Sequence, residues 1–468
     1  VWAKRVLDLD GTGFNAQPVL DLVQYTDAEQ QAMALQLKTA IDGLSKLSTD
    51  ALSQALSDAK AIDSTLYTAE SYQKLADAIT AAQAVLDNSA STQEEIDAQA
   101  AALRSAIDAL ETVSKSDGWD GKTVSEPKQL DDTSVNITSA EELAWLAQQV
   151  NSGRSFTSVF LDQDIDLNGK AWTAIGTQAH PFSGTFYGNG HTVSNLLVTA
   201  GGSYQGLFGY LKGTASEKAG VKDLNVQGVV KTTANYVGGV VGGALYTNIE
   251  NVHSSVSVTV DRVNNKDYAA TAGGVVGEMI YGSVYHCSNT GAITAPQQEK
   301  VGGVAGYASG TYIRESYNTA DITAGASTGG VVGHFIAYGT VVGVMSCYNT
   351  GDVSGVGSGG GGVAGSAVAS KKGDTAGMAV LSSLYNRGDV TAQHTVGGIV
   401  GSYTGGDVSQ LSAVYSTGKV TSTNDNAISP STGALVGRMY SGQIYGAYAL
   451  EGTADALYTL GQKSSSST

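Results

Sequence analysis

Tyrosines at a regular spacing are the residues of this sequence best suited to binding chemistry. Five of them recur through the C-terminal half at intervals of 30 to 37 residues. Sugar rings stack on aromatic faces, so a row of this kind is a candidate glycan-binding surface. The alternative is that the rings stack on one another and shield a turn, and the sequence leaves both open. The five residues are Tyr317, Tyr348, Tyr385, Tyr415 and Tyr448.

Aspartates recur at the same period, four residues after three of these tyrosines. Stacked like charges either attract a cation or are simply solvated. Asp321, Asp352 and Asp389 are therefore candidate metal ligands, with solvation as the alternative.

A second candidate metal site lies near the start of the chain. Asp8 and Asp10 flank Leu9, which is similar to the alternating carboxylates of a calcium-binding loop. The position where a bidentate acid would close such a loop is Val19, so the alternative is that residues 1–25 are the frayed end of an upstream region. Ca²⁺ is the one cofactor that the sequence suggests.

Catalytic constellations are weak in this sequence. The zinc-binding string His-Glu-x-x-His does not occur among its six His residues, which disfavours a metallopeptidase. Glycan hydrolysis needs two carboxylates across a cleft, and Asp162, Asp164 and Asp166 alternate so that they share a face. They belong to the opening pattern of the repeat region, however, which favours a structural role at a turn or cap. We assign no catalytic residue and expect no enzyme, with a glycoside hydrolase or lyase as the alternative.

The composition limits the kinds of partner and the classes of fold that we expect. The 468 residues include 60 Gly but only 5 Pro, which suits many tight turns between closely stacked backbones. The net charge is -17 and Lys and Arg do not cluster, so we expect no nucleic acid partner. No apolar stretch reaches the roughly 18 residues of a membrane helix, so we expect no membrane insertion.

A Gly-x-x-Gly theme recurs from residue 206 onward at a period of 27 to 36 residues, which indicates a repeat architecture. Short β-branched runs separated by glycine-rich turns, with no helix between them, predict coils stacked as a parallel β-helix. The eight copies begin at Gly206, Gly239, Gly274, Gly303, Gly330, Gly362, Gly398 and Ala434.

Stacking in register predicts which residues share a column. Successive strand residues point to opposite sides, so the tyrosines face outward and the residues before them face inward. The asparagines after them, from Asn289 to Asn386, form a ladder of stacked amides. Cys287 and Cys347 occupy one inward column two coils apart, roughly 9–10 Å from each other. A disulfide needs less than about 7 Å, which predicts two free, buried thiols.

Helical periodicity characterises the region before the repeats. Apolar residues predict helices over about 49–63 and 68–87 and a third with Ile96, Leu103, Ile107 and Leu110 on one stripe, with Ser91-Thr92-Gln93-Glu94 ahead of it as a capping box. Short connections predict a small three-helix bundle. A further helix at 26–47 is similar to the last one, because Leu37–Leu44 resembles Leu103–Leu110. After the bundle, Ser139-Ala140-Glu141-Glu142 begins one more helix, which we expect to cover an end of the solenoid.

The bundle resembles the FIVAR family, small helical modules of surface proteins in Gram-positive bacteria. The resemblance rests on Leu66-Tyr67-Thr68-Ala69-Glu70-Ser71-Tyr72 and Ser91-Thr92-Gln93-Glu94-Glu95-Ile96, and covers roughly 49–115. It implies an extracellular parent protein with several domains.

The repeats resemble the GLUG family, whose theme Gly206-Leu207-Phe208-Gly209 matches most literally. The opening segment resembles the β-helix found ahead of IgA-specific metallopeptidases and in surface proteins of gut bacteria. The resemblance covers about 135–450 and implies a right-handed β-helix on the cell surface, without implying one activity. The opening segment matches at Ala140-Glu141-Glu142-Leu143, Asp164-Ile165-Asp166-Leu167, Trp172-Thr173-Ala174-Ile175-Gly176 and Phe182–His191.

The sequence therefore predicts a mostly β chain, a right-handed parallel β-helix preceded by a small three-helix bundle. We expect an unassigned upstream end (1–25), a FIVAR-like spacer (26–115), a linker (116–134), the β-helix with its capping helix (135–455) and a tail (456–468). We interpret the chain as a non-catalytic, monomeric stalk or adhesin segment of an extracellular, cell-surface-anchored protein. A glycan or a host surface protein is the expected partner, and a glycan-active β-helix is the alternative.

Overall fold

The computed structural model describes residues 26–42, 48–60, 62, 67, 69–88, 90–110, 118–261, 270–357, 359–406, 408–423, 431–450, 452–453 and 460–463. The chain divides into two compact units, Val1–Ser116 and Asp117–Thr468. Asp8 and Asp10 lie outside the described residues. Within the described part, no helix combines the length and the apolar character that crossing a membrane requires.

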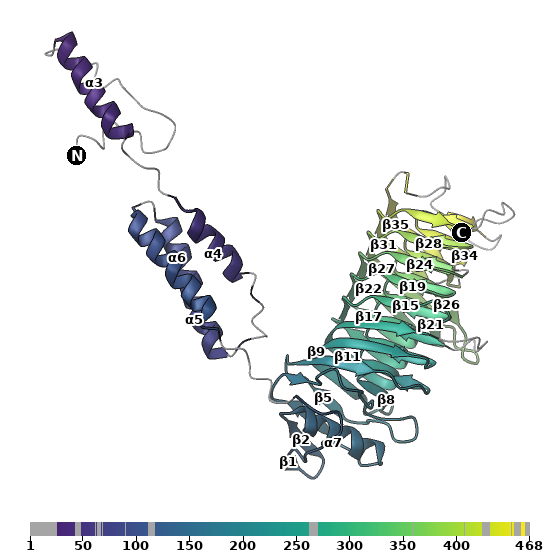
Figure 1. Ribbon diagram of the computed structural model, residues 1–468. Coiled ribbons are helices and arrows are strands. Elements are labelled where there is room, and N and C mark those ends of the chain that lie inside the picture. The colour runs from purple at the N-terminus through teal and green to yellow at the C-terminus, as the bar shows by residue number, and fades with distance from the viewer. Residues whose placement is uncertain are drawn as a thin grey trace. The chain divides into compact units, whose positions relative to one another are not determined.

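The first unit contains the predicted three-helix bundle. Its helices are α4 (Asp50–Lys60), α5 (Ala69–Asp87) and α6 (Gln93–Asp108), and α3 (Asp27–Asp42) precedes them. The three helices of the bundle lie side by side (Figure 1). They bury one apolar cluster in which Leu52, Leu75 and Leu103 are fully shielded from water, so the helical spacing of apolar residues does form the core.

The capping box of α6 lies one residue later than predicted. The Oγ1 of Thr92 accepts the backbone N–H of Glu95, and the carboxylate of Glu95 accepts the N–H of Thr92. Ser91 is not the cap because its hydroxyl donates to the carbonyl of Val85, at the end of the preceding helix. The sequence offers two overlapping capping boxes, Ser91 with Glu94 and Thr92 with Glu95. Because the hydroxyl of Ser91 is bonded to Val85, Thr92 is the residue that caps the helix.

The second unit begins earlier than predicted, so the expected linker 116–134 is wrong over most of its length. Trp119 is buried in the solenoid core, where its ring centroid lies 5.7 Å from that of Trp172. The hairpin of β1 (Lys128–Asp131) and β2 (Ser134–Ile137) follows, and β2 pairs in parallel with β3 (Ser158–Leu161).

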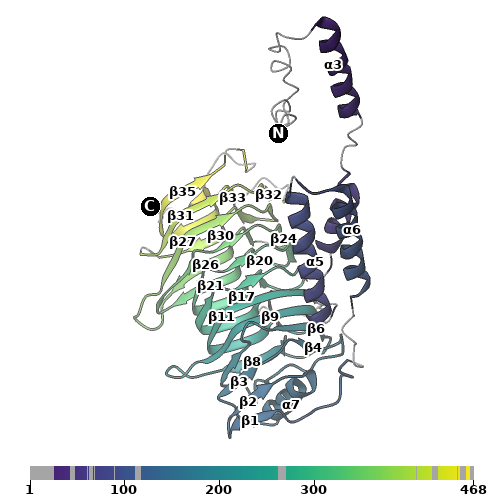
Figure 2. The ribbon, with the colours of Figure 1, turned by 90° about the vertical axis from the view of Figure 1, so that its left-hand side faces the viewer.

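The predicted capping helix is α7 (Ala140–Asn151), and its N-cap Ser139 accepts the backbone N–H of Glu142. Leu143, Leu146 and Val150 on its apolar face belong to the same buried cluster as the solenoid interior. The helix lies beside β1 and β2 at one end of the solenoid (Figures 1 and 2). It therefore covers apolar surface that the first coil would otherwise expose.

The solenoid consists of parallel strands stacked coil upon coil. One wall is an eight-stranded sheet of β7 (Tyr204–Gln205), β10 (Tyr236–Gly238), β12 (Thr271–Gly273), β16 (Lys300–Gly302), β20 (Ser327–Gly329), β25 (Gly359–Gly361), β29 (Thr395–Gly397) and β33 (Ser431–Gly433). The remaining walls form a 28-stranded sheet that also includes β1 to β3.

The first strands of this larger sheet belong to the opening coils: β4 (Ile165–Asp166), β5 (Thr185–Tyr187), β6 (Thr192–Val198), β8 (Phe208–Lys212), β9 (Ala219–Thr232) and β11 (Val241–Val260). The middle coils add β13 (Val276–Tyr285), β14 (Ser288–Asn289), β15 (Ile293–Ala295), β17 (Ala305–Arg314), β18 (Tyr317–Asn318), β19 (Ile322–Ala324), β21 (Val332–Tyr338), β22 (Val341–Met345), β23 (Tyr348–Asn349) and β24 (Val353–Gly355). The last coils add β26 (Ala364–Ser370), β27 (Met378–Asn386), β28 (Val390–Ala392), β30 (Val400–Thr404), β31 (Gln410–Ser416), β32 (Val420–Ser422), β34 (Val436–Ser441), β35 (Gln443–Ala449) and β36 (Leu460–Lys463).

The predicted register is confirmed along the repeats. Tyr317 pairs with Tyr348, Tyr348 with Tyr385, Tyr385 with Tyr415 and Tyr415 with Tyr448. The strands follow one another up a single axis (Figures 1 and 2). The parallel β-helix is therefore the fold, while its right hand stays a prediction. The expected tail is partly wrong, since β36 continues the stack by pairing with β34.

Each coil turns one corner through a residue in the left-handed backbone region, with φ between 49° and 55°. Such a conformation costs a non-glycine residue roughly 1–2 kcal/mol, so stacking must hold it in place. The corner does not depend on one residue type. Its column is Asp223, Asn251, His286, Glu315, Ser346, Ser383 and Ala413.

The predicted asparagine ladder runs inside the solenoid. The Nδ2 of Asn289, Asn318 and Asn349 each donates to the Oδ1 of the next asparagine, at 2.7, 2.8 and 2.8 Å, and the ladder reaches Asn386. Each Nδ2 also donates to the carbonyl two residues later, as from Asn349 to Gly351 at 2.6 Å. All four side chains are fully buried. The amides therefore link consecutive coils and close the turn within each coil.

The ladder explains the first glycine of the Gly-x-x-Gly theme. A Cβ added to Gly330 would lie 2.3 Å from Cγ of Asn349 and 2.1 Å from the carbonyl oxygen of Gly362, so no side chain fits there. Gly274, Gly303 and Gly362 meet their own coil's asparagine in the same way. In the last coil both partners change, since Ala434 replaces the glycine and Ala449 stands in the ladder column. The first glycine of the Gly-x-x-Gly theme and the asparagine of the ladder therefore recur together because they contact each other.

The two cysteines are free and buried, which confirms the prediction drawn from the register. Burial raises the pKa of both Cys287 and Cys347 to about 12, so neither forms a thiolate at neutral pH.

We predict that Asn349→Ala lowers the free energy of unfolding by about 3 kcal/mol, because it removes three buried hydrogen bonds and leaves the Oδ1 of Asn386 without its donor. Urea unfolding followed by circular dichroism measures the change. The exposed neighbour Thr350 supplies the matched control, since Thr350→Ala should change stability by less than about 0.5 kcal/mol. Equal effects of the two variants would contradict a structural role for the ladder.

Candidate functional site

The tyrosine column is a stack of rings. Centroids lie 4.7 Å apart between Tyr317 and Tyr348, 4.7 Å between Tyr348 and Tyr385, and 5.1 Å between Tyr385 and Tyr415, with interplanar angles of 2°, 3° and 8°. Burial, followed by the neighbouring tyrosines, raises the pKa of Tyr348. The stacked rings therefore present their edges, and not their faces, to solvent.

Ring stacking restricts where a sugar could bind on this column. Tyr348 and Tyr385 have a tyrosine against each face, so neither face is open to a ligand. The last two coils differ, because Tyr445 is 53% exposed and Tyr448 is 72% exposed. Together with Tyr415 they line a shallow hollow of about 500 Å³. Aromatic faces suited to stacking on a sugar thus lie at this end of the column.

The aspartate column makes hydrogen bonds to the backbone. An Oδ1 of Asp321 accepts the N–H of Asp352 at 2.9 Å, and an Oδ1 of Asp352 accepts the N–H of Asp389 at 2.8 Å. The carboxylate of Asp389 likewise accepts the N–H of Lys419 at 2.7 Å. Each carboxylate therefore joins its coil to the next, a role beyond the two that the sequence suggested. Within the described residues, no group of three or more His, Cys, Asp or Glu side chains could hold a metal ion.

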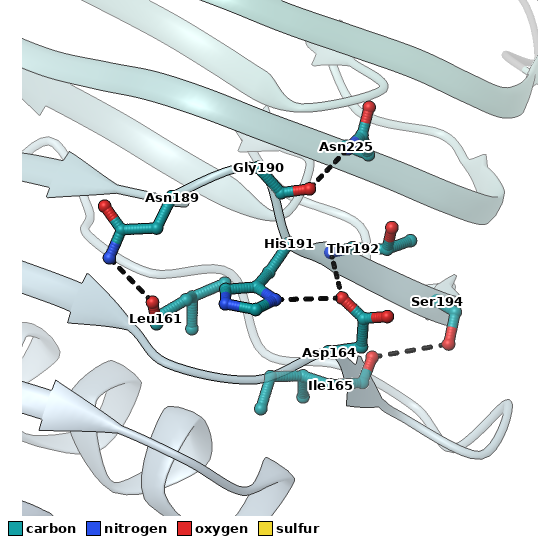
Figure 3. Close-up of polar contacts among 9 residues, drawn as sticks. All are labelled: Leu161, Asp164, Ile165, Asn189, Gly190, His191, Thr192, Ser194 and Asn225. Carbon is teal, nitrogen blue, oxygen red and sulfur yellow. Dashed lines mark hydrogen bonds and ion pairs between the residues drawn. The ribbon is translucent and has the colours of Figure 1, made fainter. Parts of the chain in front are cut away.

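The carboxylates of the opening segment also hold coils together. An Oδ1 of Asp164 accepts the backbone N–H of Thr192 at 2.9 Å and lies 3.2 Å from Nδ1 of His191 (Figure 3). The loop around His191 is tied further by Asn189, which donates to the carbonyl of Leu161 (Figure 3). Asp166 accepts from the backbone of Asn168 and from the side chain of Asn195, and Asp162 accepts from Asn136. These bonds fit the duty at turns that the sequence offered as the alternative to catalysis.

A band of outward side chains that sequence reasoning missed runs along the axis, and we call it the groove because one stretch of it is hollowed. Each Gly-x-x-Gly turn joins a strand of the eight-stranded sheet to a strand of the larger sheet, and the outward residues on both sides of the turn line the groove. The available signal was the residue directly after each theme, which varies while the theme persists. On the larger sheet these residues are Tyr210, Gly243, Glu278, Tyr307, His334, Ser366, Ser402 and Arg438.

Tyrosines fill the first part of the groove. The ring of Tyr204 stacks on that of Tyr236 at 4.6 Å and tilts against that of Tyr210 at 4.7 Å. The next coil places Glu278 beside them, and its carboxylate has no hydrogen-bond partner among the described residues. Burial raises the pKa of Glu278, while the charge of Lys300 lowers it. Burial is the larger of the two causes, so the pKa of Glu278 lies above its ordinary value.

Lys300, Tyr307 and His334 follow in the next two coils. The Nζ of Lys300 lies 5.0 Å from the ring centroid of Tyr307, a cation–π contact, and the ring of Tyr307 stacks on that of His334 at 5.8 Å. Burial first, and then the charge of Lys300, lowers the pKa of His334 to about 4. The imidazole is consequently neutral at physiological pH.

Beyond His334 the groove widens into a hollow of about 460 Å³, which we call the axial pocket. Its lining is Ser327, Gly359, Gly365, Ser366, His394, Thr395, Ser402, Arg438 and Tyr440.

The side chains of the groove differ from the carboxyl pair of a glycoside hydrolase. Hydrolysis of a glycoside needs two carboxyl groups across the bond. Glu278 is the one acid in its outward column among the described residues, where its neighbours in adjacent coils are Gly243 and Tyr307. Tyrosine faces, hydroxyls, imidazoles and cations are groups that orient a ligand.

Comparison with known proteins identifies two modules. Residues 48–111 match the FIVAR domain and residues 233–259 match the GLUG motif, as predicted. Both modules are typical of extracellular surface proteins. A solved structure named a "putative immunoglobulin A1 protease" from Bacteroides ovatus is 18% identical, with a TM-score of 0.41, over 70% of this chain and 87% of that one. Comparison with curated proteins gives no match.

We predict that stability falls with acid partly because of His334. Between pH 6.5 and about 4 the unfolded chain binds a proton at this imidazole and the folded chain does not, so the free energy of unfolding decreases as pH falls through that window. The full effect is about 3 kcal/mol. His334→Tyr, which copies Tyr307 of the preceding coil, should remove it. Urea unfolding of both proteins at pH 7 and pH 4 measures the difference, and equal losses in the two proteins would contradict the assignment.

Proposed function

We propose that the chain is a rigid segment of a large bacterial cell-surface protein, which acts as a stalk or adhesin and performs no catalysis of its own. The observation that carries this proposal is the continuous pairing of coils, since strands from β7 to β33 follow one another in register. Asparagine, aspartate and tyrosine columns reinforce the same stack. Hydrogen bonds along the axis resist bending, which is the property that a stalk requires.

The modules support an extracellular setting on a Gram-positive cell, with the bundle of α4, α5 and α6 as a spacer. Repeated small helical units extend a protein without creating an active site. One end of the stack is covered by α7, which limits coil-to-coil association between molecules, so the protein is monomeric in this proposal.

Glycan binding at the last coils is a second candidate function. It is favoured by the exposed rings of Tyr445 and Tyr448 beside a hollow, because open aromatic faces stack on sugars. A glycan-active enzyme is less well supported, because the described groove offers Glu278 without a second acid beside it.

Rigidity is tested by spin labels placed in one outward column. Gln227 and Thr417 are six coils apart, so their Cα atoms should lie about 29 Å from each other. Double electron–electron resonance on Gln227→Cys/Thr417→Cys, with Cys287 and Cys347 changed to Ala, should give one narrow distance distribution.

A second pair, Thr290→Cys/Thr417→Cys, is the matched control, because it shares a label and spans two coils fewer. Its mean distance should be shorter by about 10 Å. Broad distributions, or equal means for the two pairs, would rule out a rigid stalk.

Glycan binding is tested on an array with the wild-type chain and two variants. For a sugar that the wild type retains, Tyr448→Ala should weaken binding about fivefold, because an open ring face is lost. Tyr348→Ala should leave it nearly unchanged, because both faces of that ring are already covered. Equal losses in the two variants, or no bound sugar, would count against this second function.

A further inference from the structure

The axial pocket is bounded lengthwise by bulky side chains and is lined between them by small ones. On one side the coil of β20 and β21 brings His334 to the groove, next to Tyr307 of the coil before it, and on the other side the coil of β33 and β34 brings Arg438. Between them Ser366 and Ser402 occupy the column that Tyr307 occupies earlier. The pocket therefore lies where two coils carry serine, directly after the rings of Tyr307 and His334 in the same column.

Three hydroxyls of this pocket lack a partner in the described chain. They belong to Ser327, Ser366 and Ser402, which are half-buried and make no hydrogen bond to other described residues. A hydroxyl both donates and accepts, so these groups complement a ligand that is itself rich in hydroxyls. Half-buried polar groups gain most from a ligand that displaces their water and replaces its hydrogen bonds.

Arg438 supplies a fixed positive charge at one end of the pocket. Its Nε and Nη2 donate to the Oγ of Ser431 at 3.1 and 2.9 Å, and its Nη1 donates to the hydroxyl of Tyr440 at 3.1 Å. These bonds hold the guanidinium in one orientation, and no carboxylate pairs with it in the part of the chain that the structure describes. A guanidinium has five N–H donors, so it retains donors for a carboxylate.

The charge is notable in a chain of net charge -17. An anionic ligand is repelled by most of such a surface and gains binding energy only where a cation is displayed. Arg438 at one end of the pocket and hydroxyls along it therefore select a ligand that carries both negative charge and many hydroxyl groups.

We propose that the axial pocket binds an acidic glycan, with a sugar carboxylate on Arg438 and sugar hydroxyls on Ser327, Ser366 and Ser402. An acidic peptide fits less well, because peptides that add to sheets need an unpaired strand edge. The strands that line the middle of this pocket, β25, β26, β29 and β30, are already paired on both sides by neighbouring coils. The site is separate from the tyrosine column and does not depend on the stalk function.

Isothermal titration of the full chain tests the proposal with defined probes. The acidic sugars are sialyllactose and an oligogalacturonate, lactose is the neutral counterpart of the first, and hexaglutamate is the acidic peptide. We expect at least one acidic sugar to bind, and lactose to bind at least about tenfold more weakly than sialyllactose if that is the ligand. Arg438→Gln should weaken the acidic sugar by about tenfold or more. Arg387→Gln removes an arginine that packs on Tyr385 outside the pocket, and should change binding by less than about twofold.

A second variant separates lost binding from lost folding. Ser402→Tyr places in the pocket the residue type that the same column carries at Tyr307, so the coil should accept it while the pocket is filled. It should abolish binding with an unchanged circular dichroism spectrum. Binding of hexaglutamate instead of the sugars, no binding of any probe, or wild-type affinity in Arg438→Gln or Ser402→Tyr would each overturn the proposal.

Discussion

The register of the middle coils depends on one contact, the hydrogen bond from a buried asparagine amide to the amide one coil away. A side-chain amide that is fully buried must satisfy both donor and acceptor, and here it does so only if consecutive coils keep the same register. The same amides leave no room for a Cβ on the facing glycine. Register, glycine and asparagine therefore constrain one another. Coil length is freer, because insertions fall between strands, as in residues 371–377 between β26 and β27.

A fixed interior leaves the outward columns free to vary, and the outward columns carry the chemistry. Tyrosine continues the stacking in one column, aspartate caps backbone N–H groups of the next coil in a second, and the groove columns change from tyrosine to serine to arginine along the axis. The same solenoid backbone therefore carries ring edges, open ring faces and a polar pocket at different positions along its axis. The binding sites that we propose lie at single outward positions, whereas the repeat itself determines the scaffold.

Much of the fold could be predicted from the sequence, because the spacing of the repeated residues determines which of them lie in register. The fold, the lined-up tyrosines, the ladder and the two unbonded thiols follow from it. The features that the sequence did not predict correctly have a common cause, because they depend on contacts that do not repeat from coil to coil. Trp119 belongs to the solenoid through Trp172, far along the chain, and the hydroxyl of Ser91 is taken by Val85. The groove was missed because its residues come from the two strands on either side of each turn and differ in type from coil to coil. The left-handed corner was hidden because six different residue types occupy it.

Disulfide trapping between stacked columns tests the register most directly. Thr319 and Thr350 follow asparagines that pair across adjacent coils, so their Cα atoms should lie about 4.8 Å apart, whereas Thr319 and Arg387 are two coils apart. In a background with Cys287 and Cys347 changed to Ala, Thr319→Cys/Thr350→Cys should oxidise completely to an intramolecular disulfide, while Thr319→Cys/Arg387→Cys should not. Efficient bonding of the second pair, or none in the first, would contradict the stacking of like residues on which the whole account rests.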